Sequence, residues 1–316
     1  MIVNAHVHVV SDDQQKYLRK VTPDAPAFLR EWVQDMTAET LLSLNARAGI
    51  DKTVLVQTYS AYKYDNSYAA DCAAKYPDRF TSVCILDPTQ SGTLDELTYW
   101  VEERGMRGIR LFTTTETEGT WLDDPSTFPV WERAASLGIP ICIMAYFQQI
   151  PRVRNVLERF PNVTVALDHM AMPLLSAGPP FESVQPLFEL ARFPNLYLKF
   201  SSVNLYAARR GKSKPKEFFT QLIDIFGARR LMWGSIFPAT YGRSLKDQFD
   251  LTMLFTRLID RVGARRLMRG SFLSAICDRS LKDQLDLARQ ELSFLPQEDQ
   301  RWIFGETALT LWPTLR

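Results

Sequence analysis

The chain has 316 residues, of which 46% are hydrophobic and 23% are charged. This length can bury a sizeable core in one α/β barrel or in two smaller domains. Lys and Arg number 37 against 36 Asp and Glu, so the net charge of +1 provides no basic surface for nucleic acid or an anionic membrane. We therefore expect a small-molecule partner, and homo-oligomerisation stays open.

The four cysteines show no Cys-x-x-Cys spacing, which predicts reduced core cysteines and no thiol chemistry: Cys72, Cys84, Cys142 and Cys277. The chain opens directly on an apolar strand-like run, with no basic and apolar leader. Its apolar runs all fall short of the ~20 residues that span a bilayer. We expect a cytoplasmic protein.

Short apolar runs alternate with amphipathic stretches along the chain. Eight runs are predicted strands: Ile2–Val9, Lys52–Tyr59, Phe80–Asp87, Met106–Phe112, Pro140–Tyr146, Val163–Met170, Leu196–Ser202 and Arg230–Phe237. The stretches between them include predicted helices: Ala38–Ala48, Thr93–Arg104, Val130–Leu137, Gln149–Arg159 and Ser183–Ala191. Apolar strands that alternate with helices indicate parallel βαβ units, and eight units predict one (β/α)8 TIM barrel over residues 1–316. A doubly wound open sheet is the alternative, in which the first and eighth strands would not meet.

Polar residues end most of the predicted strands. In a barrel the carboxyl ends of all strands meet at one face, where the active site forms. The residues concerned are His6, His8, Gln57, Asp87, Arg110, Tyr146, Asp168, His169, Lys199 and Ser201.

The chain has three histidines, His6, His8 and His169, all in these strand-like runs. Alternation along the first strand places His6 and His8 on the same face, where two imidazoles can bind a divalent metal or polarise a carbonyl group. The alternative is that His6 and His8 only make hydrogen bonds and bind neither a metal nor a carbonyl group. On the sixth strand we expect His169 to face the lumen and its neighbour Asp168 to face away.

A segment near the carboxyl end is repeated. Residues 219–251 recur 36 residues later as residues 255–287, with 22 of 33 positions identical. One extra unit is too few for a solenoid and indicates a recent tandem duplication, so one copy is surplus to eight strands. The first copy keeps Trp233 and Pro238 where the second has Arg269 and Ser274, so we assign the eighth strand to the first copy. The spare strand, Arg265–Leu273, is expected outside the barrel.

Four motifs resemble the amidohydrolase superfamily: Asn-Ala-His6-Val-His8-Val, Gly-Met-Arg-Gly-Ile-Arg110, Leu-Asp168-His169-Met-Ala-Met-Pro and Arg-Leu-Met-Trp-Gly-Ser-Ile-Phe-Pro238. Their order and spacing are similar to the branch that contains 2-pyrone-4,6-dicarboxylate lactonase, 4-sulfomuconolactone hydrolase and sugar lactonases. The resemblance implies a (β/α)8 barrel that hydrolyses lactones or related carboxylated compounds, as in the breakdown of aromatic compounds. It also implies a divalent metal in some members and none in others.

One position departs from the family pattern. Family members carry an aspartate at the end of the eighth strand, which activates the hydrolytic water and binds the metal where one is present. This chain has Ile236 there, and the second copy has Phe272. An aliphatic side chain cannot accept a proton, and general-base catalysis contributes about 10²- to 10⁴-fold. Either activity is reduced or lost, or another group such as Asp87 or Asp168 has taken the role.

The resemblance also implies roles for the remaining polar residues. Arg110 would bind a substrate carboxylate, Gln57 and Tyr146 would bind ring oxygens, and Lys199 would polarise the carbonyl group together with His6, His8 and His169. With the aspartate absent, we expect no cofactor or a single Zn²⁺ held by His6 and His8. A second hypothesis is an inactive barrel that binds a small carboxylate or a protein partner, and a third is a metal-dependent decarboxylase of the same superfamily.

Overall fold

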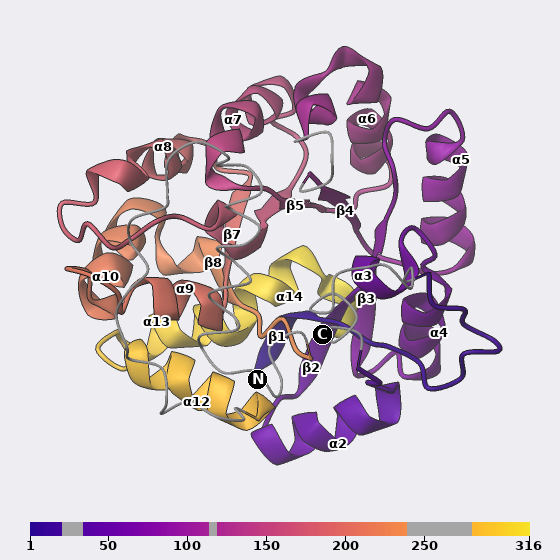
Figure 1. Cartoon of the computed structure of the whole chain (residues 1–316), viewed down its shortest axis with the longest axis horizontal. Helices are drawn as coiled ribbons and strands as arrows, with labels where there is room; N and C mark the ends of the chain where they lie inside the picture. Colours follow the sequence, from indigo (N-terminus) through magenta and orange to yellow (C-terminus); the bar gives the residue numbers. More distant parts are fainter. Residues whose placement is uncertain (21–33, 114–118, 239–279) are drawn as a thin grey trace.

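The computed structural model describes residues 1–20, 34–113, 119–238 and 280–316. Eight parallel strands follow one another in chain order, each hydrogen bonded to the next (Figure 1). They are β1 (Val3–Val7), β2 (Lys52–Val56), β3 (Phe80–Ile85), β4 (Ile109–Phe112), β5 (Ile141–Met144), β6 (Val165–Leu167), β7 (Leu196–Phe200) and β8 (Leu231–Trp233). All eight predicted strands are therefore present, each shorter at its carboxyl end or its amino end than expected.

The last strand returns to the first. His8 N donates to Phe237 O at 2.7 Å and Ile236 N donates to His6 O at 2.9 Å, just beyond the end of β8. A Cβ atom on Gly234 would lie 2.6 Å from the Cβ of His6, so the approach of the two strands requires glycine here. The sheet is a nearly closed (β/α)8 barrel, and the open-sheet alternative is wrong.

Helices surround the strands as an outer ring, except for the last helix, Thr307–Leu311, which lies near the centre of the view (Figure 1). They are α2 (Ala38–Ala48), α3 (Tyr59–Tyr62), α4 (Ser67–Lys75), α5 (Thr93–Thr98), α6 (Phe128–Ser136), α7 (Ile150–Arg159), α8 (Gln185–Phe188), α9 (Ser202–Ala207), α10 (Pro215–Phe226), α12 (Leu281–Glu291), α13 (Gln297–Arg301) and α14 (Thr307–Leu311). The five predicted helices correspond to α2, α5, α6, α7 and α8, and α5 continues into a π-helical turn over Tyr99–Glu103. No helix of the described segments is long and apolar enough to cross a membrane.

The core has two parts. A large apolar cluster fills the layer between strands and helices, and a smaller one fills part of the barrel interior. α14 (yellow, near the centre of Figure 1) adds Leu311 and the following Trp312 to the inner cluster. The Trp312 indole donates to Arg107 O at 3.0 Å, and Lys199 Nζ lies 5.1 Å from the ring centre. The carboxyl terminus therefore closes the interior below the side chains of the site.

The two copies of the repeat contribute different elements. The first copy provides β8, as predicted, and Ser235 fixes it to β1 because Ser235 N donates to Asn4 Oδ1 at 2.9 Å. The second copy provides α12, which begins after Ser280 and packs against α2 and α9. The predicted spare strand, Arg265–Leu273, lies outside the described residues. Of the cysteines, Cys72, Cys84 and Cys142 are free and buried, and Cys277 also lies outside the described residues.

Candidate active site

His6 and His8 reach the same region from the end of β1. His6 is fully buried, His8 is 9% exposed, and their ring centres lie 4.9 Å apart in an edge-to-face arrangement. His8 Nδ1 lies 2.9 Å from Val56 O. Because a carbonyl oxygen can only accept, Nδ1 of His8 carries the proton of the neutral ring and Nε2 keeps a lone pair.

The chain after β6 makes an uncommon turn. His169, Met170, Ala171 and Met172 all have φ between 52° and 56°, in the left-handed region that residues other than glycine rarely occupy. The turn closes through Met172 N, which donates to His169 O at 2.9 Å. Asn204 Nδ2 donates to the same oxygen at 2.7 Å from α9. Such strain is typical of functional sites that the surrounding structure holds in place.

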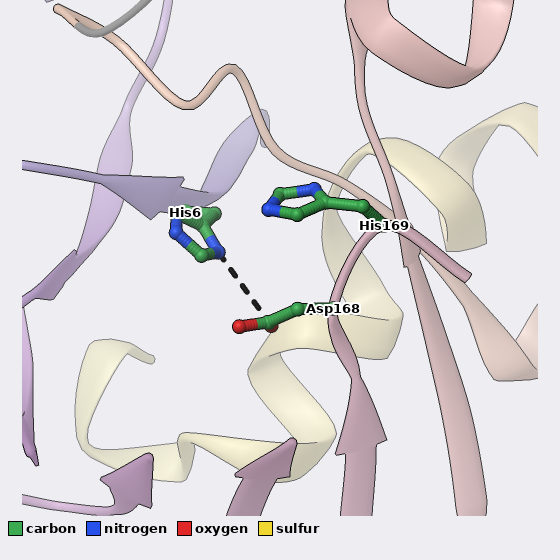
Figure 2. Close-up of side chains that lie close together, drawn as sticks. All are labelled: His6, Asp168 and His169. Atoms are coloured by element: carbon green, nitrogen blue, oxygen red, sulfur yellow. Dashed lines mark ion pairs between the residues drawn. The ribbon is translucent and has the colours of Figure 1, made fainter. Parts of the chain in front are cut away.

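This turn corrects the expectation for Asp168. Since β6 ends at Leu167, strand alternation no longer applies, and Asp168 and His169 both point toward His6 (Figure 2). His6 Nδ1 lies 3.6 Å from Asp168 Oδ1, longer than a hydrogen bond. The ring centres of His6 and His169 are 4.9 Å apart.

Asp168 is the centre of a buried charge network. Arg110 Nε donates to its Oδ2 at 2.7 Å, and Lys199 Nζ lies 3.1 Å from its Oδ1. Burial alone would raise the pKa of Asp168, but the charges of Lys199 and Arg110 outweigh it and hold this pKa well below its usual value. Burial would likewise lower the pKa of Lys199, yet Asp168 raises it, so both groups stay charged.

The three imidazoles are neutral. Burial lowers the pKa of His8 to about 4 and that of His169 to about 3, with Arg110 adding to both effects. Burial also lowers the pKa of His6 well below its usual value, although Asp168 opposes the change. Arg110 and Lys199 are positively charged and Asp168 is negatively charged, so the buried cluster of these three residues and the neutral histidines carries one net positive charge. Such a cluster suits an anionic ligand.

Gln57 and Tyr146 lie at the ends of β2 and β5, as expected, and both are buried. The Gln57 amide donates to Lys63 O and Asp65 O, each at 2.8 Å, so its Oε1 is the atom left for a ligand. Asp87 lies apart from the group, because its carboxylate accepts from Thr89 and Gln90 in its own loop.

Cys142 belongs to this region and was missed by the sequence reasoning. Lys199 Nζ lies 3.2 Å from its Sγ, inside the barrel. Strand alternation in the sequence could have indicated this position, because Cys142 lies between two residues of a predicted strand that face outward. Its role there is packing beside the lysine.

Ile236 follows β8 with φ of 60° and is half-buried. The structure therefore places a β-branched side chain, which is rare at positive φ, at the strand-eight position. An aspartate tolerates this backbone region better.

Comparison with known sequences assigns the chain to a family. The sequence profile of the amidohydrolase family matches residues 3–314. The chain belongs to the amidohydrolase family. This amidohydrolase is 25% identical to L-fucono-1,5-lactonase of Burkholderia ambifaria over 216 residues, which cover 68% of this chain and 74% of the relative.

Solved structures share the fold of this amidohydrolase. One is described as a probable 2-pyrone-4,6-dicarboxylic acid hydrolase from Acinetobacter baumannii with citric acid bound, at a TM-score of 0.67, 18% identity and 99% coverage of both chains. Another is an amidohydrolase from Burkholderia multivorans with bound zinc, at a TM-score of 0.68, 17% identity and 99% coverage of both chains. At these sequence identities the similarity shows a shared barrel fold and no more.

The donor set for a metal in this amidohydrolase differs from the predicted pair. Ligand atoms of His6, Asp168 and His169 lie within 4.8 Å of one another, and His8 is not in this group. The number and types of donor match a catalytic zinc site. The surrounding charge does not match such a site, because Arg110 and Lys199 already form ion pairs with Asp168 and would repel a divalent cation. The residues present therefore do not fit a divalent metal well.

Proposed function

We propose that this amidohydrolase hydrolyses a lactone or a related carboxylated small molecule, with turnover reduced by Ile236. One observation carries the proposal. Within the described segments the Arg110 guanidinium donates through Nε to Asp168, which leaves both Nη groups for a ligand. A guanidinium fork of this kind matches the geometry of a carboxylate.

In the proposed reaction, Arg110 binds the substrate carboxylate and Tyr146 contacts a ring oxygen. Gln57 Oε1 can only accept, so Gln57 would take a hydrogen bond from the attacking water and not contact a ring oxygen as the resemblance implies. His6, His169 and Lys199 surround the ester carbonyl group and stabilise negative charge on its oxygen. His8 does not share this role, because its proton is on Nδ1, which donates to Val56 O, and its Nε2 can only accept. Water attacks the carbonyl carbon, the ring C–O bond of the tetrahedral intermediate breaks, and the product is a hydroxy acid. No step passes through a metal.

The described residues of the site offer no strong acceptor for the proton of the attacking water. Ile236 cannot accept a proton, and Asp168 is a poor base because its pKa is held low by Lys199 and Arg110. Asp87 is engaged in its own loop. His8 Nε2 has a lone pair, but a pKa of about 4 makes it a weak base. We therefore infer slow hydrolysis.

Restoring the carboxylate tests the function. The variant Ile236→Asp is compared with Ile236→Asn, which has the same shape without the charge, on 2-pyrone-4,6-dicarboxylate and fucono-1,5-lactone. We expect Ile236→Asp to raise hydrolysis by about 10²- to 10⁴-fold and Ile236→Asn to leave it low. Ester hydrolysis is followed by pH-stat. If Ile236→Asp and the native chain are both inactive on lactones, while both are folded, the lactonase proposal is wrong.

The charge argument against a metal is tested on the same proteins. Dialysis against a chelator and addition of Zn²⁺ should leave hydrolysis by Ile236→Asp unchanged within about twofold. Loss of activity on chelation, restored by Zn²⁺, would show that the histidines bind a catalytic metal despite the neighbouring cations. Release of CO₂ from an aromatic acid in that case would favour the decarboxylase alternative.

Ile236 itself favours a second candidate, an inactive barrel that binds a small carboxylate or a protein partner. Its signature is a carboxylate that binds through Arg110 and is recovered unchanged after long incubation. Hydrolysis by the native chain that is lost in His169→Ala would reject this candidate.

A further inference from the structure

An aromatic wall stands beside Arg110 at the mouth of the barrel. We define it as Tyr59, Tyr64 and Phe112. The rings of Tyr59 and Phe112 stack with centres 4.8 Å apart and an angle of 22° between planes. Tyr64 meets Tyr59 edge to face at 5.4 Å. All three side chains are half-buried, unlike the fully buried His6 and Lys199, so part of the wall remains accessible.

The register of β4 connects this wall to the site. Phe112 lies two residues after Arg110, so strand alternation puts both side chains on the same face. That face is the lumen, because Arg110 bonds to Asp168 across the barrel. Phe112 is nearer the carboxyl end of the strand and hence nearer the mouth. The Arg110 guanidinium carbon lies 5.1 Å from the Phe112 ring centre.

The other half of the wall is held by Gln57. Its amide donates to Lys63 O and Asp65 O, which fixes the short loop that carries Tyr64. Lys63 Nζ lies 4.9 Å from the Tyr59 ring centre. The wall is thus a fixed surface, in which the rings are positioned before a ligand arrives.

A carboxylate bound to the Nη groups of Arg110 would bring the group attached to it next to Phe112, which Tyr59 supports from behind by stacking. A flat conjugated ring can lie against these rings with the offset or edge contacts that aromatic pairs prefer. A puckered saturated ring makes poorer contact with the wall and has no π-system to match it. Aromatic contacts of this kind are worth roughly 2- to 10-fold in affinity.

We propose that Tyr59 and Phe112 select ligands in which the carboxylate is attached to a planar, conjugated ring, and disfavour saturated rings. This inference rests on the proposed function, since it takes Arg110 as the carboxylate-binding group. The aromatic wall would distinguish planar from saturated rings, while Arg110 would bind the carboxylate that both kinds of ligand carry.

Benzoate and cyclohexanecarboxylate provide a matched pair of probes, because they carry the same carboxylate on a flat and a puckered six-membered ring. Their dissociation constants for the native chain are measured by ligand-observed NMR and calorimetry. We expect benzoate to bind roughly 3- to 10-fold more tightly. Tyr59→Leu and Phe112→Leu should each remove most of this preference and leave cyclohexanecarboxylate within about twofold. Tyr99→Leu, on the outer helical layer, is the control and should keep the preference.

The outcomes separate this inference from the proposed function. Equal binding of the two probes by the native chain, with both lost in Arg110→Gln, overturns the role of the wall and leaves the carboxylate site intact. Binding of both probes that survives in Arg110→Gln overturns the carboxylate site and the inference with it. A preference for benzoate that persists in folded Tyr59→Leu and Phe112→Leu also overturns the role of the wall.

Discussion

Ile236 occupies a backbone conformation that suits its side chain poorly. Its φ of 60° is unfavourable for a β-branched residue, whereas asparagine and aspartate tolerate this region. We expect Ile236→Asn to leave the free energy of unfolding unchanged or to raise it by about 1 kcal/mol. Chemical denaturation measures the change.

Ile2 supplies the control for this substitution, because it is also partly buried and its φ is not positive. Ile2→Asn should lower the free energy of unfolding by about 1–3 kcal/mol, since it loses apolar burial without relief of strain. Equal losses in the two variants would show that the Ile236 backbone is not strained.

The three histidines make stability depend on pH. In the folded chain the pKa values of His8 and His169 are about 4 and about 3, and that of His6 is also lowered, so all three stay neutral while the unfolded chain binds protons below about pH 6.5. Their contribution is present above that pH and is lost as the pH falls. The three together should lower the free energy of unfolding by up to roughly 4 kcal/mol per pH unit between pH 6 and pH 4.

Denaturation at several pH values in the native chain and in His169→Gln isolates one of these groups. The variant should reduce the slope by up to about 1.4 kcal/mol per pH unit. An unchanged slope would mean that His169 is protonated in the folded protein.

At the scale of elements, the left-handed turn after β6 decides which side chains form the site. Asn204 supports this turn from α9, since its Nδ2 donates to His169 O while its Oδ1 accepts from Ser201 N at 3.0 Å. Asn204→Ala should lower the free energy of unfolding by about 1–3 kcal/mol. We also expect it to weaken carboxylate binding, because Asp168 and His169 lose their fixed positions.

Asn195 is a matched control at the opposite end of β6. Its Nδ2 donates to Val163 O at 2.7 Å, away from the site. Asn195→Ala should lower stability without changing the benzoate dissociation constant measured by calorimetry. If Asn204→Ala destabilises the chain but binds benzoate as tightly as the native protein, the turn does not position the site.

At the scale of the whole molecule, the barrel takes β8 from one copy of the repeat and α12 from the other. Deleting residues 249–284 joins Gln248 to Leu285 and restores the sequence Ser-Leu-Lys-Asp-Gln-Leu-Asp-Leu. This sequence retains the serine and aspartate that cap α12, where Ser280 Oγ accepts from Asp283 N. We expect the shortened chain to melt at the same temperature as the native chain or higher.

A deletion that extends to residue 291 is the control, because it removes α12 and the buried Leu285 completely. It should lower the melting temperature strongly or prevent folding. If the shorter deletion has the same effect, the first copy does not supply the eighth strand and Ile236 is not at the site.

Much of the barrel could be predicted from local patterns. Apolar runs bounded by polar residues located all eight strands, and α2 was predicted at its observed bounds, Ala38–Ala48. The strand ends were less accurate. The predicted strand Val163–Met170 ends at Leu167, because the chain turns into left-handed backbone from His169 onward, and no glycine marks this turn in the sequence.

Sequence patterns alone predicted the barrel over an open sheet, the strand-end position of Arg110, Lys199 and the three histidines, and the substitution at Ile236. These follow from hydrophobic periodicity and from residue identity, which are local properties. The tertiary structure alone decided that Asp168 joins the site and that Arg110 and Lys199 both neutralise it. It also decided that the aromatic wall stands beside Arg110. Backbone direction after β6 and contacts between strands distant in sequence depend on how the whole barrel closes.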